Sequence, residues 1–538
     1  MGFTWSTESN KGIVAAGVCG NSAAAEAGIG ILRSGGNAAD AAAATVLALC
    51  VTDFGLCSIG GEVPVLVFDA TTRKVKALSG QGRAPLDSKS IDWFLQKGIP
   101  PQCRGDIKSA AVPSVVDTCL TLLRLYGTLS LRKVAEPTLR LLTSTVRPWH
   151  PRLATTLNRL IEEENSQGTS REEGLQAASD RFYGRSQSRN DIAEELEAFY
   201  IRGNGFLRMT DLAAHSTRLE DPVTINYRGY TVCKCGPWTQ GPALLQALRL
   251  LEDTDFAKVG RLSADYIHLV AESLKLALAD RDGYYGDPDF VEVPLAQLLS
   301  DEYSRMRRSL IDMQRASCEA RPGDPIRMAA IKGHGILRPG GDGTTTCVVA
   351  DQWGNVVAAT PSANAHWNPE GGGTGVVHGN RLCSFNTNPG HPNCIAAGKR
   401  PRITLTPTIV IKDDMPVMAV SVAGGDMQDQ VTLNLLLDII EFGKSPAEAV
   451  SAPRFATTLH QDSFDPSPDR KSTFRGAGSL WLDNGISSDI AENLRSRGHR
   501  VNCASLPVAP ALLHIDSKTL LRRAAADPSR SFAIGTDV

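Results

Sequence analysis

Three consecutive threonines, Thr344, Thr345 and Thr346, follow a loop in which five of the ten residues 333–342 are glycine or proline. The residues after them predict a hairpin, with strands over 347–350 and 356–360. If the bond between Gly343 and Thr344 is cut, Thr344 becomes a chain end with a hydroxyl and a free α-amine. One residue then holds both a nucleophile and its general base. The same threonines also suit a plain strand end, because β-branched residues favour strands.

A glycine pair, Gly424 and Gly425, lies between a predicted strand and a predicted apolar helix. Backbone N–H groups at a helix start have no partner within the helix. Two glycines let a reacting oxyanion approach these donors, which would stabilise the tetrahedral intermediate of acyl transfer. A tight turn between strand and helix uses the same residues without any chemistry.

Four polar residues could support such chemistry. Ser362 and Asn364 follow the second strand of the hairpin and could bond the amine and hydroxyl of Thr344, although they also suit a turn. Arg83 and Arg381 stand beside turns, where a guanidinium could hold a carboxylate in a bidentate fork or simply be solvated. The sequence has no G-x-S-x-G elbow, P-loop or dinucleotide fingerprint.

Composition limits the partners. The 538 residues are 42% hydrophobic and 21% charged, as in ordinary globular proteins. The net charge of −2 argues against a nucleic-acid surface. We find no signal-peptide pattern and no apolar run of about 18 residues that would span a membrane. The twelve cysteines show neither CxxC pairs nor zinc spacing, so we expect free thiols, no metal and a cytoplasmic location.

The elements that must position these residues alternate between strand pairs and apolar helices, which predicts two sheets between helix layers. We expect a surface excursion over 161–200 and a single strand over 227–235. The other predicted elements are helices over 22–34, 37–49, 263–280 and 430–442, a hairpin over 63–79, and strands over 406–412 and 417–422.

From about residue 12 to its end, the chain resembles the γ-glutamyltransferase family of N-terminal-nucleophile (Ntn) hydrolases. The similar segments, in order, are GGNAADAA (35–42), SIGG (58–61), NYRGY (226–230), ADR (279–281), YGDP (285–288), GKRP (398–401), PT (407–408), AGG (423–425) and APRF (452–455). The resemblance implies an α+β fold, a four-layer αββα sandwich. It also implies a cut before Thr344 that yields a large chain, 1–343, and a small chain, 344–538, which associate as one αββα unit.

The resemblance assigns roles to residues. It implies that Thr344 is the nucleophile and that Gly343 and Thr344 form the processing site. Ser362 and Asn364 fall on the positions that orient the nucleophile. Gly424 and Gly425 fall on the oxyanion hole, and neither a metal nor an organic cofactor is needed.

The chain departs from the family's glutathione-cleaving members around the acyl group. Gln81 replaces an arginine that holds the glutamyl carboxylate, and Ile403 with Thr404 replaces a Ser-Ser pair. Arg381 and Ser384 replace a glutamine and an aspartate. These changes, with Gln240 and the segment 426–428, are similar to the cytosolic branch that includes oxamate amidohydrolase-like proteins. The segment Glu62-Val63-Pro64 stands where many relatives keep glycines.

Three hypotheses follow. The first is a self-processing amidohydrolase or acyltransferase that cleaves a small carboxylate-bearing amide through a threonine ester. The second is a γ-glutamyl hydrolase or transferase that acts on glutathione, and the third is a relative that neither processes nor catalyses. For the first, the expected substrate-binding residues are Gln81, Arg83, Arg381, Thr404 and Asp426, with Arg381 orienting the substrate carboxylate.

Overall fold

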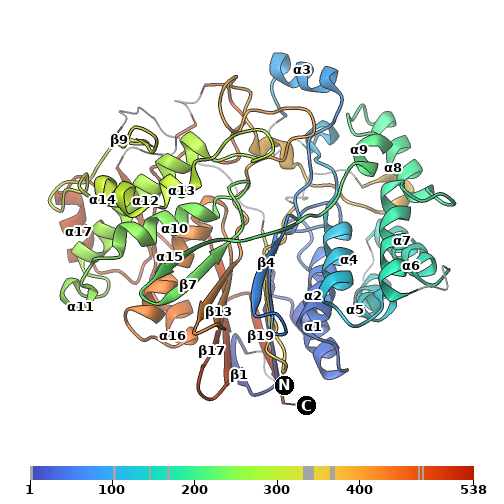
Figure 1. The fold of residues 1–538 in the computed structure, drawn as a ribbon, viewed down its shortest axis with the longest axis horizontal. Coiled ribbons are helices and arrows are strands. Elements are labelled where there is room, and N and C mark those ends of the chain that lie inside the picture. The colour runs from blue at the N-terminus through green and yellow to red at the C-terminus, as the bar shows by residue number, and fades with distance from the viewer. Residues whose placement is uncertain are drawn as a thin grey trace.

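Two seven-stranded antiparallel sheets lie face to face at the centre of the molecule, with helices on both outer sides (Figure 1). The computed structural model describes residues 4–100, 105–144, 147–166, 170–330, 344–363, 370–469, 473–474, 476 and 478–537. The strand order of the first sheet is β1 (Ser6–Ser9), β18 (Arg522–Ala526), β17 (Ala509–Ile515), β13 (Met415–Ala423), β12 (Thr408–Lys412), β7 (Tyr230–Lys234) and β6 (Val223–Tyr227). The order of the second is β19 (Phe532–Thr536), β2 (Gly12–Ala16), β10 (Cys347–Ala350), β11 (Val356–Ala359), β3 (Val65–Asp69), β4 (Lys74–Leu78) and β5 (Leu219–Glu220).

Helices cover the outer face of each sheet (Figure 1). On the side of the second sheet lie α1 (Ala23–Arg33), α2 (Ala38–Thr52), α4 (Val115–Tyr126), α5 (Leu131–Ser144), α6 (His150–Ser166), α7 (Arg171–Tyr183), α8 (Asp191–Arg202) and α9 (Met209–Ala213). On the side of the first lie α10 (Gly241–Leu251), α11 (Phe256–Val259), α12 (Ala264–Tyr284), α13 (Leu295–Leu298), α14 (Asp301–Arg308), α15 (Gln428–Ile440), α16 (Pro446–Ser451) and α17 (Ser488–Ser496). Peripheral elements are α3 (Ser88–Lys97), β14 (Phe455–Thr457), β15 (Ser479–Leu482), β16 (Arg500–Cys503), β8 (Gly323–Asp324) and β9 (Ala329–Ala330).

Three apolar clusters fill the three spaces between the four layers. Strand β10 shows how one strand supplies two of them, because successive side chains of a strand point to opposite faces. Val348 packs between the sheets, whereas Val349 packs against the helices beside the second sheet. The third cluster joins α10, α12 and α15 to the first sheet. These four layers confirm the predicted αββα sandwich.

Both sheets contain strands from before and from after position 343. Strand β10 pairs with β2 on one side and β11 on the other, and β11 in turn pairs with β3. In the first sheet, β12 pairs with β7. A cut before Thr344 would therefore leave two chains that share both sheets and the helix layer beside the first sheet.

Helix α2 begins where the sequence predicts. The Asn37 side chain accepts from the backbone N–H groups of Ala39 and Asp40, and the Asp40 carboxylate accepts from the Asn37 N–H. This reciprocal capping box satisfies donors that the first helical turn leaves open. The helix is buried on nearly all sides, which explains its alanine-rich sequence.

Two predictions about local structure are wrong. Residues 227–235 do not form one strand: β6 and β7 make a hairpin, because Arg228 and Gly229 have φ angles of 51° and 82°. Two consecutive positive φ angles are typical of the tight hairpin turn. The segment 161–200 is not a surface excursion, since Leu175, Phe182 and Leu196 belong to the core beside the second sheet.

Among the described residues, no helix has the length and apolar character needed to cross a membrane. The eleven cysteines that the structure describes are all free thiols. Most of these thiols are buried, but Cys19, Cys318 and Cys503 are exposed.

Candidate active site

Thr344 lies at the entrance to β10 and is only 4% exposed. The next two threonines have structural bonds. The Thr345 hydroxyl donates to Asp53 at 2.6 Å and its N–H donates to Pro361 O at 2.9 Å. The Thr346 hydroxyl faces the Gly17 carbonyl at 3.4 Å. Of the three hydroxyls, that of Thr344 is the one beside a side-chain amide, that of Gln428.

Thr344, Ser362 and Glu62 form a row across three neighbouring strands. Cys347 pairs with Ala359, and the bond from Thr345 to Pro361 continues this register, so Ser362 lies opposite Thr344. Ser362 and Glu62 exchange two backbone hydrogen bonds of 2.9 Å each. Residues directly opposite each other in an antiparallel pair present their side chains on the same face. This row agrees with the expectation that Ser362 orients Thr344.

Gln428, the first residue of α15, is a candidate site residue to which the sequence analysis gave no role, although it noted the segment 426–428. Its side-chain amide lies 3.4 Å from Thr344 Oγ1. When the amide nitrogen donates to Thr404 O and Val422 O, both at 3.0 Å, its oxygen faces the threonine hydroxyl. The signals in the sequence were its place three residues after the glycine pair and the similarity of the segment 426–428 to the cytosolic branch.

The glycine pair lies between β13 and a short 3₁₀ turn, Gly425–Met427, that precedes α15. Gly424 has a φ of 146° and Gly425 a φ of 55°, values that residues with a Cβ rarely adopt. A Cβ on Gly424 would lie 2.6 Å from Val508 Cγ1. Neither glycine N–H donates to another described residue, so both remain available as oxyanion donors.

Arg381 is not the free carboxylate clamp that the sequence analysis expected. Its Nε donates to Glu62 at 2.6 Å, its Nη2 forms an ion pair with the same carboxylate, and Nη2 also donates to Ser362 Oγ at 2.8 Å. Burial raises the pKa of Glu62, and Arg381 opposes that shift. The unusual Glu62 therefore supplies the counter-ion for the unusual Arg381.

Asp426 is also paired rather than open to a substrate. The Arg281 Nη1 donates to Asp426 and to Gln240 Oε1, and the Ser463 hydroxyl donates to the same carboxylate. Arg281 lies on α12 and is fully buried. This network fixes the residue that directly follows Gly425, so its evident role is to hold the turn.

The remaining predicted substrate-binding residues differ in their surroundings. Gln81 and Thr404 are buried, and within the described residues Gln81 Oε1 and Thr404 Oγ1 have no hydrogen-bond partner. Arg83 is 3.4 Å from Asp289 in a half-buried ion pair. Burial lowers the pKa of Arg83, and Arg400 and Arg218 lower it further. Arg83 is therefore one cation in a cluster of charged residues that also contains Asp289. Asn364 and Gly343 lie outside the described residues.

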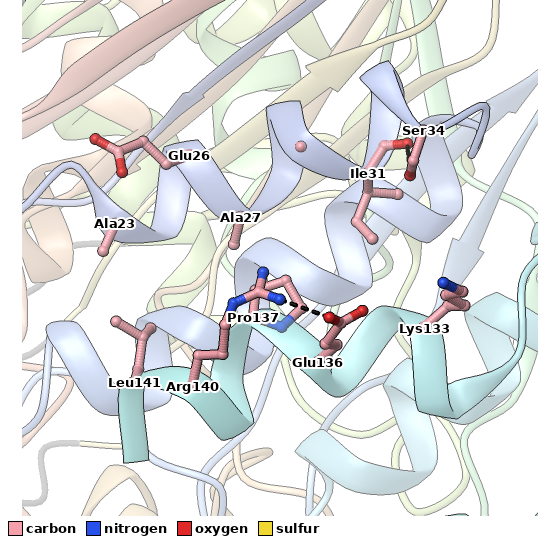
Figure 2. A pocket seen from close by; sticks show the side chains of 11 residues that line it. Ala23, Glu26, Ala27, Ile31, Ser34, Lys133, Glu136, Pro137, Arg140 and Leu141 are labelled. Atoms are coloured by element: carbon pink, nitrogen blue, oxygen red, sulfur yellow. Dashed lines mark hydrogen bonds and ion pairs between the residues drawn. The ribbon is translucent and has the colours of Figure 1, made fainter. Parts of the chain in front are cut away.

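Two further features lie apart from Thr344. His268, Glu272 and His499 could together hold a metal ion, but His268 already bonds His499 at 2.8 Å and Glu272 pairs with Lys275 at 2.6 Å. A groove of about 550 Å³ lies between α1 and α5 (Figure 2). Its wall includes the exposed ion pair of Glu136 and Arg140, and none of the residues around Thr344 lines it.

Comparison with known proteins gives consistent matches. A family model described as Gamma-glutamyltranspeptidase matches residues 24–167 and 143–535. The glutathione hydrolase proenzyme of Bacillus subtilis (strain 168) is 28% identical over 551 residues, which cover 95% of this chain and 89% of that protein. Among solved structures, LmbA2991HD is 32% identical with a TM-score of 0.86, and covers 100% of both chains. The cephalosporin acylase from Bacillus halodurans is 26% identical with a TM-score of 0.80, over 100% of this chain and 98% of that one.

Proposed function

The chain belongs to the gamma-glutamyltranspeptidase family, and from this premise we propose that it is a self-processing amide hydrolase whose nucleophile is Thr344. The observation that supports this most is the environment of Thr344. It lies three residues before the central strand β10, is almost fully buried, and lies beside Gln428 and at the register position opposite Ser362. The B. subtilis relative is a proenzyme, which agrees with a chain that must be cut.

In the processing step, the Thr344 hydroxyl attacks the carbonyl carbon of Gly343. The acyl group moves from nitrogen to oxygen, and water then hydrolyses the ester. The products are a large chain that ends at Gly343 and a small chain that begins with the free amine of Thr344. Because β10 and β11 lie between strands of the large chain, the two products stay together.

In turnover, the α-amine of Thr344 takes the proton of its own hydroxyl. A free α-amine has a pKa of about 7.7–8.0, close to neutral pH, so it can act as a general base without large tuning. The hydroxyl attacks the substrate amide, and the N–H groups of Gly424 and Gly425 hold the oxyanion. The leaving amine departs with a proton, and water or a second amine resolves the threonine ester.

The acyl group separates the candidate reactions. The relatives include a glutathione hydrolase and a cephalosporin acylase. We favour hydrolysis of a small acyl amide over glutathione cleavage, because Gln81 and Thr404 replace the groups that hold a glutamyl carboxylate in glutathione-cleaving members. Arg381 was the main reason to expect a carboxylate on the substrate. Because Arg381 is paired with Glu62, this reason no longer holds.

A gel of the purified 57.5 kDa chain tests self-processing. We expect two fragments, with the smaller one starting at Thr344. Thr344→Ala should remain intact, because it lacks the attacking oxygen. Thr346→Val is the matched control: it removes a neighbouring hydroxyl of the same strand and should still process. An intact wild-type chain would contradict the proposal.

A paired assay then tests the acyl preference. Processed enzyme is given a γ-glutamyl anilide and, separately, small uncharged acyl amides whose hydrolysis releases ammonia. We expect ammonia release to exceed anilide cleavage, because Arg381 is paired with Glu62 and is not free to hold an acyl carboxylate. Robust turnover of glutathione would instead favour the γ-glutamyl hydrolase hypothesis.

A further inference from the structure

Glu62 and Arg381 form a buried ion pair that directly contacts the row containing Thr344. We propose that this pair positions Ser362 beside Thr344 and cancels the charge on the adjacent wall of the acyl-binding site, so that the acyl group accepted there is uncharged. The inference rests on the proposed function, since it concerns the substrate of the same site.

The contacts leave Arg381 little capacity for a substrate. The side chains of Arg381 and Glu62 are 2% and 3% exposed. Nε and Nη2 are bonded to Glu62 and Ser362, and Nη1 lies 3.4 Å from Ser384 Oγ. The Phe464 ring lies 5.7 Å from the guanidinium carbon. A substrate carboxylate would have to displace one of these partners.

Electrostatics disfavours that displacement. A buried guanidinium without a partner is strongly destabilising, so the fold needs the Glu62 carboxylate in place. A second carboxylate brought to the same guanidinium would meet the negative charge of Glu62 at short range. Like charges that share a site oppose the ionisation of both. The wall therefore discriminates against anions although it contains an arginine.

The direction of the hydrogen bonds gives Ser362 a defined role. A serine hydroxyl has one proton and two lone pairs, and Arg381 occupies one lone pair of Ser362. Its proton therefore points away from Arg381. Thr344 is the register neighbour of Ser362 on the side opposite Glu62, so the bond from Arg381 fixes the Ser362 side chain on the face that this row of residues shares. Glu62 and Arg381 act through Ser362, as positioning residues.

Neighbouring groups follow the same pattern. The buried carboxylates Asp426 and Asp429 are paired with Arg281 and Lys234. Among the five expected substrate-binding residues, the buried polar atoms that lack partners in the described structure are neutral: Gln81 Oε1 and Thr404 Oγ1. Thr404 is tied to Thr344 through Gln428, and the Gln81 segment bonds the residue after Glu62 through Val63 N–H and Gly80 O. Amide and hydroxyl groups of this kind recognise a neutral polar acyl end.

The test uses two p-nitroanilides of equal size. One has a succinyl acyl group, which ends in a carboxylate, and the other has its carboxamide counterpart, which is neutral. We expect processed wild-type enzyme to show the higher kcat/KM for the carboxamide. Glu62→Gln frees the charge of Arg381, so the ratio should move toward the succinyl probe by about tenfold or more, chiefly through KM.

Further variants separate positioning from folding. Glu62→Gln combined with Arg381→Gln removes both charges, and should restore the wild-type ratio while lowering kcat for both probes, because Ser362 loses its donor. This double variant also serves if Glu62→Gln alone does not fold. Glu272→Gln, which unpairs a buried lysine on α12, is the matched control and should leave the ratio unchanged.

Three results would overturn the inference. They are a wild-type preference for the succinyl probe, hydrolysis of neither probe by processed wild-type enzyme, and a folded Glu62→Gln variant with the wild-type ratio. Failure of the wild-type chain to process would instead contradict the proposed function, so the two failures are distinguishable.

Discussion

At the scale of single residues, the three threonines show that chemical type alone does not define a nucleophile. Their hydroxyls are identical, yet Thr345 is bonded to Asp53 and Thr346 faces a backbone carbonyl. The Thr344 hydroxyl has an amide neighbour, Gln428, which bridges it to Thr404 and Val422. We therefore expect Gln428 to hold the hydroxyl in its reactive rotamer.

Gln428→Leu keeps the volume of the side chain and removes the amide, so processing and kcat should fall roughly tenfold, the effect of losing one hydrogen bond. Single-turnover kinetics on processed enzyme would measure this. Gln430→Leu is the matched control, because Gln430 bonds Asp426 O and Thr457 O rather than Thr344. Equal losses of kcat in the two variants would reduce Gln428 to a structural residue.

At the scale of elements, the turn between β13 and α15 depends on two supports. The backbone of Gly424 and Gly425 adopts positive φ angles, and within the described part of the chain their N–H groups donate to no other residue. Arg281 on α12 holds Asp426, the next residue, in a buried ion pair. The backbone conformation of the two glycines and the ion pair of Asp426 together fix the direction of these N–H groups.

Gly424→Ala should lower kcat by about 10²-fold or more, the cost of losing one oxyanion donor. The added Cβ would meet Val508 Cγ1 at 2.6 Å and force the turn to move. Gly443→Ala is a suitable control, since its φ is also positive, 62°, but nothing lies near its Cβ position. Steady-state kinetics and unfolding midpoints of both variants separate strain from loss of the donor.

At the scale of the whole molecule, buried ionisable groups make stability depend on pH. His215 is 2% exposed, and burial lowers its pKa to about 4 although Asp117 opposes the shift. Arg185, Arg83 and Arg400 lower it further. Below its ordinary pKa of about 6.5, the unfolded chain binds a proton that the folded chain rejects. Stability is therefore lost as the pH falls from about 6.5 toward 4.

Acidification from pH 7.5 to 5.5 should lower the free energy of unfolding by about 1.4 kcal/mol through His215. Chemical unfolding midpoints at the two pH values would measure the change. In His215→Gln, which keeps a polar side chain without an ionisable ring, the difference should shrink by about that amount. An unchanged difference would show that other groups cause the pH dependence.

Much of the fold could be predicted from local patterns. The cap at Asn37, the glycines that end helices and the hairpin at 347–359 reflect short-range physics, and the structure has them. The hairpin at Arg228 and Gly229 was missed because its two-residue turn is short and was included in the predicted strand. The segment 161–200 was misjudged because its composition is polar, although a few apolar residues at helical spacing reach the core.

The sequence alone determined which residue types could do the chemistry and, through its resemblance to a family, which threonine is predicted to begin the small chain. The assignments of Thr344, Ser362, Gly424 and Gly425 stay predictions, but the described geometry agrees with them. Only the tertiary structure decided the partners of the charges. Glu62 and Arg381 are 319 positions apart in the chain, and no local pattern relates them. Buried charges pair because the dielectric of the interior is low. Arg381, the expected anion clamp, is therefore part of an ion pair without net charge.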